Sequence, residues 1–250
     1  MLLTVDIGNT NVKAGVISQQ SVLQKSSIPK GQFDGNKNPF AELFSDINIS
    51  AIAIMSVVPG ISEHVAAAAR ERFELEPILI TNAMGSGVKF NVRYPDRVGI
   101  DRVASALASY TALKGPTLTV DFGTVTSMSV MDKDGVFSGG ALFPGVSLIS
   151  ESLHSRTALL PLLNIDGSTK NPSALGKHTE EAILSGIFYG TAGAIDNIMR
   201  ETERELGYNI RVVITGGGAQ IMEPFLKRVD LVDDNLSLKG LGLLYDRLSK

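Results

Sequence analysis

The sequence of 250 residues contains no cysteine. Disulfide bonds, thiolate metal sites and a thiol nucleophile are therefore excluded. It also lacks any apolar stretch close to the roughly 20 residues needed to span a bilayer. The apolar run at the start of the chain is five residues long and ends at Asp6, which does not read as a secretory signal. We therefore expect a cytoplasmic protein with no membrane partner.

An excess of positive charge is also missing. The formal net charge is −3 and the isoelectric point is near 5.7, whereas a nucleic-acid-binding protein normally carries a basic patch. We therefore expect no nucleic-acid partner. Hydrophobic residues make up 44% of the chain and charged residues 20%, which is enough apolar material for one large or two small globular domains.

Two common nucleotide-binding motifs are absent. The chain contains neither a G-x-x-x-x-G-K-[ST] loop nor a G-x-G-x-x-G sequence, so a P-loop or Rossmann nucleotide site loses its main support. The three histidines, His64, His154 and His178, do not have the spacing of metal ligands. We interpret them as structural or surface residues.

An internal repeat is the most informative feature that is present. Residues 4–8 read T-V-D-I-G and residues 119–123 read T-V-D-F-G, and each is followed by a polar turn and a second apolar segment. Both copies predict a β-hairpin with an aspartate, Asp6 or Asp121, at the end of its first strand. An internal repeat of this kind indicates that the fold contains two similar structural units.

The repeat divides the chain near Lys114-Gly115-Pro116, which predicts domains at residues 1–115 and 116–250. In the first half we expect strands at 51–58 and 77–81 and helices at 61–73 and 100–113. In the second we expect strands at 117–120, 125–131 and 211–215 and a long helix at 180–206. These elements predict an α/β fold of mixed sheets flanked by helices.

The two Asp-Gly turns offer the groups that a polyphosphate needs. Glycine lets backbone N–H groups approach phosphate oxygens, and Asn9, Thr10 and Lys13 add donors and a positive charge. A carboxylate beside a phosphate requires a cation, so we expect Asp6 to bind Mg²⁺. Each turn taken alone is also consistent with a purely structural hairpin.

Paired turns like D-x-G-[NT]-T resemble those of the superfamily of acetate and sugar kinases, heat-shock protein 70 and actin. The resemblance implies two ribonuclease-H-like domains of the actin-like ATPase fold, with ATP in a cleft between them. It also implies that the first turn and the following strand, together with the second turn, bind the nucleotide. The implied ATP-binding residues are Asp6, Ile7, Gly8, Asn9, Thr10, Asn11, Val12, Lys13 and Thr124.

Residues 94–102 read Y-P-D-R-V-G-I-D-R, just before a predicted helix. Gly99 permits an unusual backbone angle, and free N–H groups at a helix start favour anions. Asp101 could equally be only a helix cap and Arg102 only a solvated charge. The string resembles the Y-P-x-x-x-G-x-D-R signature of type III pantothenate kinases. The resemblance implies that Asp101 is the catalytic base and that the segment, including Tyr94, Gly99, Ile100 and Arg102, binds pantothenate.

Further segments resemble the same family in the same order. Residues 139–145 resemble G-G-x-x-x-P-G, residues 215–219 an adenosine-side glycine turn, and residues 236–241 L-x-L-x-G-L. Residues 179–186 resemble a stretch whose threonine, here Thr179, contacts pantothenate. Each of these segments could also be an ordinary turn or helix start. The family further implies a homodimer and a monovalent cation, K⁺ or NH₄⁺, bound by Asp121.

The implied activity is ATP-dependent phosphorylation of pantothenate in coenzyme A biosynthesis. Two alternatives remain open from the sequence. One is a non-catalytic, nucleotide-binding accessory factor for transcription, and the other is a kinase or phosphatase of the same superfamily that acts on a sugar, acetate or polyphosphate. The helix predicted at 180–206 is apolar on most faces, which predicts burial in the core or against a partner subunit.

Overall fold

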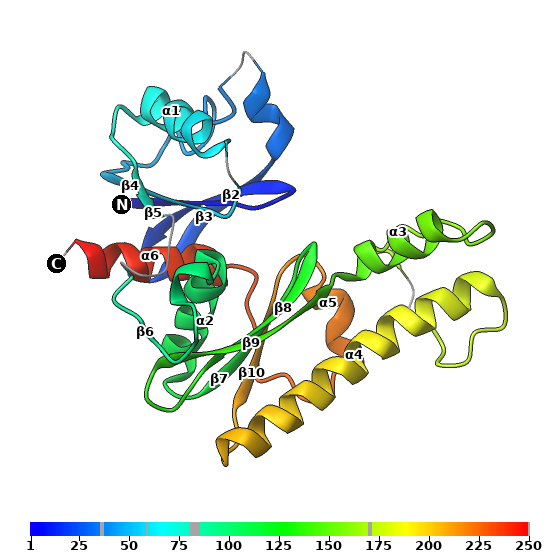
Figure 1. Cartoon of the computed structure of the whole chain (residues 1–250). Coiled ribbons are helices and arrows are strands. Elements are labelled where there is room, and N and C mark those ends of the chain that lie inside the picture. Colours follow the sequence, from blue (N-terminus) through cyan, green and yellow to red (C-terminus); the bar gives the residue numbers. More distant parts are fainter. Residues whose placement is uncertain (36–37, 59, 81–85, 170–171, 250) are drawn as a thin grey trace. The chain divides into compact units, whose positions relative to one another are not determined.

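The computed structural model describes residues 1–250 except 36–37, 59, 81–85, 170–171 and 250. The described chain forms two compact units (Figure 1). The first contains Met1–Lys114, Met131–Ser138 and Asn235–Lys250, and the second contains Gly115–Val130 and Gly139–Asp234. No helix within the described ranges is both long and apolar enough to span a membrane.

The first unit contains a five-stranded mixed sheet in the order β3-β2-β1-β4-β5. β1 pairs antiparallel with β2 and parallel with β4, β2 pairs antiparallel with β3, and β4 pairs parallel with β5. Residues opposite each other include Asp6 with Lys13 and Asp6 with Met55. The bounds are β1 Leu2–Ile7, β2 Asn11–Ser18, β3 Ser21–Pro29, β4 Ala51–Ser56 and β5 Ile78–Ile80.

Helices cover both faces of this sheet because its central strands are apolar on both sides. In β4, Ile52 and Ile54 share a core cluster with α1 (Ser62–Phe73). The alternate residues Ala53 and Met55 share another cluster with α2 (Ile100–Leu113) and α6 (Leu236–Leu248). Since successive strand residues point to opposite faces, α1 lies on one face and α2 and α6 on the other.

The second sheet has the order β11-β10-β7-β8-β9-β6. Reading from β9 to β11, the order β9-β8-β7-β10-β11 repeats the order of the first sheet strand for strand, and β6 is added at one edge. β10 pairs parallel with both β7 and β11. The bounds are β6 Lys89–Phe90, β7 Thr117–Phe122, β8 Val125–Met131, β9 Val136–Pro144, β10 Arg211–Thr215 and β11 Leu231–Val232.

The repeat in the sequence is therefore a repeat in the fold. Each half places its T-V-D-x-G segment on the central strand, β1 or β7. The chain has an α/β fold built from two ribonuclease-H-like halves, as the sequence predicted. Three helices belong to the second half: α3 (Val146–Arg156), α4 (Thr179–Leu206) and α5 (Ala219–Met222). Short 3₁₀ turns occur at Lys30–Asp34, Pro95–Arg97 and Glu223–Phe225.

The compact units differ from the predicted single division after residue 115. The chain does change units between Lys114 and Gly115, but Met131–Ser138 and Asn235–Lys250 belong to the first unit. Helix α6 belongs to the first unit because it packs closely against α2 and β2. A Cβ placed on Gly240 would overlap the backbone of Ala104 in α2, and one on Gly15 would lie 2.8 Å from Leu238 Cδ1. Two glycines thus allow α6 to pack directly on α2 and β2.

The predicted elements agree closely with the structure. The helices expected at 100–113 and 61–73 are found at Ile100–Leu113 and Ser62–Phe73, and the strand expected at 211–215 is found at Arg211–Thr215. The strand predicted at 77–81 is described as Ile78–Ile80, and residue 81 lies outside the described part of the chain.

Candidate active site

The first Asp-Gly turn connects β1 to β2. The Gly8 N–H donates to the Asn11 carbonyl oxygen at 3.0 Å and closes the turn, while the Lys30 N–H donates to the Thr10 carbonyl oxygen at 3.0 Å. Asn9 and Thr10 are exposed, so their side chains are available to a ligand. Asp6 is only 9% exposed. The turn therefore presents polar groups above an almost buried carboxylate.

Four further predicted ATP-binding residues differ in what they can offer. The side chains of Ile7 and Val12 are fully buried in the core of the first unit, so only their backbone groups can meet a ligand. Asn11 and Lys13 are half-buried, and Lys13 lies opposite Asp6 in the β1–β2 register.

The start of α2 lies at the same sheet edge as this turn. β1 and β4 run parallel and end together, with Ile7 opposite Ser56, and the Val57 N–H points to the Ile7 carbonyl oxygen at 3.5 Å. A Cβ placed on Gly99 would lie 3.8 Å from Val57 Cγ1. Since directly paired residues point to the same face, Asp6 shares with Met55 the face that α2 and α6 cover.

Gly99 is the N-cap residue of α2. The prediction that it adopts an unusual backbone angle is wrong. Its φ is −58° and its ψ is 131°, which any residue can adopt. Glycine instead leaves space for the Asp101 carboxylate, because a Cβ would lie 2.5 Å from Asp101 Oδ1. A larger residue at this position would displace the Asp101 carboxylate.

Burial raises the pKa of the Asp101 carboxyl above its usual range. The N–H groups of Arg102 and of Asp101 itself and the positive charge of Arg102 oppose that rise in pKa. A carboxylate held in this way binds a proton more readily than one in water. A raised pKa is a property that general bases need, and here the carboxylate also meets N–H groups of the first turn of α2.

Arg102 and Tyr94 have different surroundings. The Arg102 guanidinium carbon lies 5.7 Å from the centroid of the buried Phe137 ring, and burial lowers the pKa of Arg102. Tyr94 is 54% exposed and lies under Arg97, whose guanidinium carbon is 4.8 Å from the ring centroid. Ile100 is buried in the α2 core, so only its backbone can contact a substrate.

Glycines of two other loops lie against the second Asp-Gly turn. Gly216, with φ +90°, passes so close to Asp121 that a Cβ would overlap its Oδ1 and lie 2.8 Å from the Phe122 backbone. The Gly218 N–H donates to the Phe122 carbonyl oxygen, and the Gly145 N–H donates to the Thr124 carbonyl oxygen, both at 3.0 Å. The backbone of two other loops thus contacts the turn that carries Asp121 and Thr124, while Asp121 is half-buried and residues 123–125 are exposed.

The structure groups the predicted residues into two sets. Asp6, Gly8, Asp101 and Arg102 belong to the first unit, and Asp121 and Thr124 belong to the second. Thr179 is the first residue of α4, in the second unit, and is exposed. The sequence resemblance pointed to the 139–145 and 215–219 segments but assigned no contact to Gly145 or Gly216. Nothing in the sequence pointed to Phe137.

Among the described residues, no group of three or more acidic, histidine or cysteine side chains could hold a metal ion alone. This fits Mg²⁺, which is commonly bound by one or two carboxylates together with substrate phosphates. Asp6, beside a turn with exposed polar groups, can supply the carboxylate. Asp121 and the carbonyl oxygens of the turns around it offer the hard oxygen donors that a cation such as K⁺ requires.

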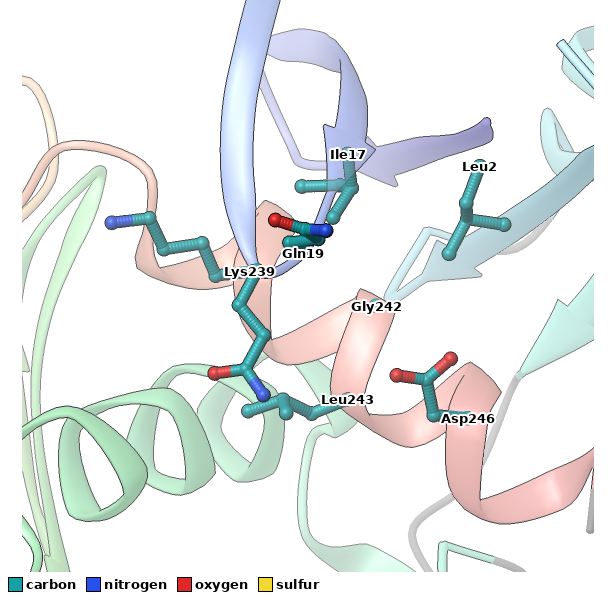
Figure 2. Close-up of a pocket in the computed structure, with 8 residues that line it drawn as sticks. Leu2, Ile17, Gln19, Lys239, Gly242, Leu243 and Asp246 are labelled. Carbon is teal, nitrogen blue, oxygen red and sulfur yellow. The ribbon is translucent and has the colours of Figure 1, made fainter.

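A pocket of about 340 Å³ lies elsewhere in the first unit, between the β2–β3 hairpin and α6 (Figure 2). It includes Leu2, at the opposite end of β1 from Asp6. Asp6 is four residue steps along the strand from Leu2, or roughly 13 Å. The pocket is therefore not part of the candidate site. Its lining residues are Leu2, Ile17, Gln19, Gln20, Lys239, Gly242, Leu243 and Asp246.

Solved structures with low sequence identity support the fold alone. A Campylobacter jejuni protein assigned to the Baf family of transcriptional activators has a TM-score of 0.65 and 18% sequence identity, covering 98% of this chain and 97% of that one. A fold shared at this identity does not carry an activity with it.

Sequence relatives are closer and match along the whole chain. The protein named type III pantothenate kinase in Listeria monocytogenes is 34% identical over 256 residues, which covers 99% of this chain and 97% of its own. The protein of that name in Syntrophobacter fumaroxidans is 31% identical over 259 residues, which covers 100% and 99%. The family model of type III pantothenate kinase matches residues 2–201. The chain belongs to the type III pantothenate kinase family.

Proposed function

We propose that this protein transfers the γ-phosphoryl group of ATP to the primary hydroxyl of pantothenate and so forms 4′-phosphopantothenate in the first step of coenzyme A biosynthesis. The observation that carries the proposal is the placement of Asp101. A buried carboxylate with a raised pKa lies at the sheet edge that also carries the Gly8–Asn9–Thr10 turn.

In the reaction, the hydroxyl oxygen of pantothenate forms a bond to the γ-phosphorus, and the bond from that phosphorus to the β–γ bridging oxygen breaks. The hydroxyl proton passes to Asp101, and ADP leaves with the bridging oxygen. Phosphoryl transfer has a loose transition state, so catalysis is mostly positioning and charge neutralisation. Asp101 therefore needs to accept the proton only when the new bond is largely formed.

Nucleotide binding draws on the turns and strands named above. Backbone N–H groups of residues 7–12 and the side chains of Asn9, Thr10, Lys13 and Thr124 bind phosphate oxygens. The Asp6 carboxylate holds Mg²⁺, which when bound neutralises phosphate charge. Support comes from the exposure of Asn9, Thr10 and Thr124 in the two turns and from the fit of a single carboxylate to Mg²⁺ beside phosphates.

Asp121 binds a monovalent cation, K⁺ or NH₄⁺, in this proposal. Its carboxylate lies against the Gly216 loop, and the neighbouring turn is closed by Gly145. A site that loop backbone contacts has carbonyl oxygens at hand for a weakly hydrated cation.

Pantothenate is held by residues 94–102. Arg102 binds its carboxylate, because the planar guanidinium matches a carboxylate with two parallel hydrogen bonds. Tyr94 and the backbone of Gly99 and Ile100 orient the rest of the molecule. Thr179 supplies a further contact, from either the same or the neighbouring protomer.

The protein acts as a cytoplasmic homodimer in this proposal. One face of α4 is buried in the second core, but the opposite face carries Gly186, Gly190 and Gly193, where an added Cβ would meet nothing within 4 Å. The same unit exposes large apolar side chains at Leu142, Leu159, Leu162, Leu175 and Tyr189. Exposed apolar residues on one unit are typical of a surface that a second subunit covers.

Subunit mixing tests the assembly. Asp101→Asn and Thr179→Arg protomers, each inactive alone, should regain part of the activity after exchange if Thr179 acts in the neighbour's site. Absence of recovery after verified exchange assigns Thr179 to its own protomer. A fully active monomer in sedimentation contradicts the dimer.

The activity is tested with radiolabelled ATP and a panel of acceptors that includes pantothenate, acetate and several sugars. We expect label to pass to pantothenate in preference to the others, with Mg²⁺ required. Transfer to a sugar or to acetate would assign a different kinase activity. ATP binding without transfer to any acceptor would favour a non-catalytic regulator.

A further inference from the structure

The contact between Arg102 and Phe137 joins segments far apart in the sequence. Arg102 is in the first turn of α2, whereas Phe137 is in β9, in the segment Met131–Ser138 that belongs to the first unit. The guanidinium carbon is 5.7 Å from the ring centroid, within the range of a cation–π interaction. Phe137 is 0% exposed, so a fully buried ring lies against the half-buried Arg102 side chain.

Phe137 is held in place through both its ring and its backbone. Phe90 lies opposite Phe137 in the β6–β9 pair, with ring centroids 5.8 Å apart, and the Asn91 N–H donates to the Phe137 carbonyl oxygen at 2.9 Å. Farther along α2, the Tyr110 hydroxyl donates to the Lys133 carbonyl oxygen at 3.3 Å. The segment is thus fixed to α2 near both ends of the helix.

A ring face restrains a guanidinium without using its hydrogen-bond donors. The five N–H groups of arginine lie in the plane of the guanidinium, so a ring that stacks on the flat side of that plane takes up none of them. The orientation of the plane decides whether a carboxylate can receive two parallel hydrogen bonds from its edge. The contact with the ring can therefore orient the Arg102 guanidinium while the N–H groups along the edge of the guanidinium serve in hydrogen bonds.

We propose that Phe137 is a positioning residue that orients Arg102 toward the carboxylate end of the substrate. The inference rests on the proposed function, in which Arg102 binds that carboxylate. Phe137 does not touch the substrate in this arrangement. It fixes the plane of the guanidinium in advance, so that less conformational freedom is lost when the carboxylate binds.

The test compares pantothenate with its alcohol analogue, in which CH₂OH replaces the carboxylate. The ratio of kcat/KM for the two substrates measures recognition of the carboxylate alone. In Phe137→Leu we expect this ratio to fall by about threefold to tenfold, the size of one partly desolvated cation–π contact. The fall should come mainly from a higher KM for pantothenate, with little change in the KM for ATP.

Phe40→Leu is the matched control. Phe40 is also 0% exposed, lies in the other core cluster of the first unit and contacts Phe33 and Phe73. It should lose thermal stability as Phe137→Leu does but keep the wild-type substrate ratio. If Phe137→Leu fails to fold, Phe90→Leu decides. It loosens the support of the ring, and a smaller fall in the ratio is expected.

Arg102→Gln separates this inference from the function it rests on. If that variant keeps the wild-type ratio, Arg102 does not bind the carboxylate and the proposed role of Arg102 fails. If Arg102→Gln loses the discrimination while Phe137→Leu, or Phe90→Leu in its place, keeps the wild-type ratio, Phe137 is only a core residue and the inference is overturned.

Discussion

The two halves of this protein share a strand order and a turn motif, yet their turns are built differently. The turn after Asp6 is closed by its own Gly8–Asn11 hydrogen bond and is joined to Lys30, with Asn9 and Thr10 exposed. The turn after Asp121 is joined to Gly145, and the Gly216 loop passes close to the Asp121 carboxylate. Both turns expose polar groups, but Asp6 is almost buried whereas Asp121 is half-buried and lies against a glycine loop.

The helices that follow the two repeats differ as well. α2 begins Ile100-Asp101-Arg102, whereas α6 begins Leu236-Ser237-Leu238. Ser237 is buried and carries no charge at neutral pH. Of these two helix starts, that of α2 carries a carboxylate and a cation and that of α6 carries neither. The predictions below are ordered by the size of their expected effect.

The largest effect is expected from Asp101→Asn. Asparagine has nearly the same shape but cannot accept the hydroxyl proton, so turnover should fall by roughly 10²-fold or more. Nucleotide binding and the fold should be retained, because the Asn Oδ1 can still accept from the Arg102 and Asp101 N–H groups that meet the Asp101 carboxylate. Steady-state kinetics with a parallel ATP-binding titration measure both. Turnover close to that of the wild type would reduce Asp101 to a structural residue.

Alanine substitutions in the two glycine turns should differ in cost. At Gly216 an alanine meets the Asp121 carboxylate and requires a φ of +90°, so we expect a loss of about 1–3 kcal/mol in unfolding free energy. At Gly8 the added Cβ would lie 3.2 Å from the Asn11 carbonyl oxygen, which a small shift relieves. Denaturant titrations of Gly216→Ala and Gly8→Ala compare the two, and equal losses would argue against the close approach of the Gly216 loop to Asp121.

A smaller effect concerns pH. Because the pKa of Asp101 is raised in the folded state, its ionised form costs stability once the pH exceeds that raised value, and the cost vanishes below the pKa of the unfolded chain. Asp101→Asn should therefore be slightly more stable than the wild type at neutral pH, with no difference in strong acid. The wild-type rate should fall with acid at a higher pH than an ordinary aspartate would give. Parallel stability curves at all pH values would contradict this account.

The sequence predicted the fold because its information is local. The T-V-D-x-G repeat, the apolar strand runs and the glycine breakers predicted two similar α/β halves, and helices such as Ile100–Leu113 were found at the predicted residues. The return of α6 to the first unit was not predicted. It depends on Gly240 meeting Ala104, a contact between residues 136 positions apart that no local pattern contains.

The residues of the candidate site stay a prediction, and the structure changes the physical reasons for two of its positions. Gly99 was identified, but for a backbone angle it does not have, because the clash of a Cβ with Asp101 can be seen only in three dimensions. Phe137 was missed because a phenylalanine in an apolar strand gives no sign of the cation above it. Such contacts arise from packing between distant segments.

The central claim is that the two aspartates bind different cations, and crossed titrations test it most directly. The rate is measured against Mg²⁺ and against K⁺, with Na⁺ as the reference ion, in Asp6→Asn and Asp121→Asn. Asp246→Asn, an exposed carboxylate in the pocket of Figure 2, is the control. We predict that Asp6→Asn needs at least about tenfold more Mg²⁺, the scale seen even for groups one step removed from a metal. Its K⁺ response should remain, whereas Asp121→Asn should lose the K⁺ response and keep its Mg²⁺ requirement. An unchanged K⁺ activation curve in Asp121→Asn, or the same shift in both variants, would contradict the division between the two turns.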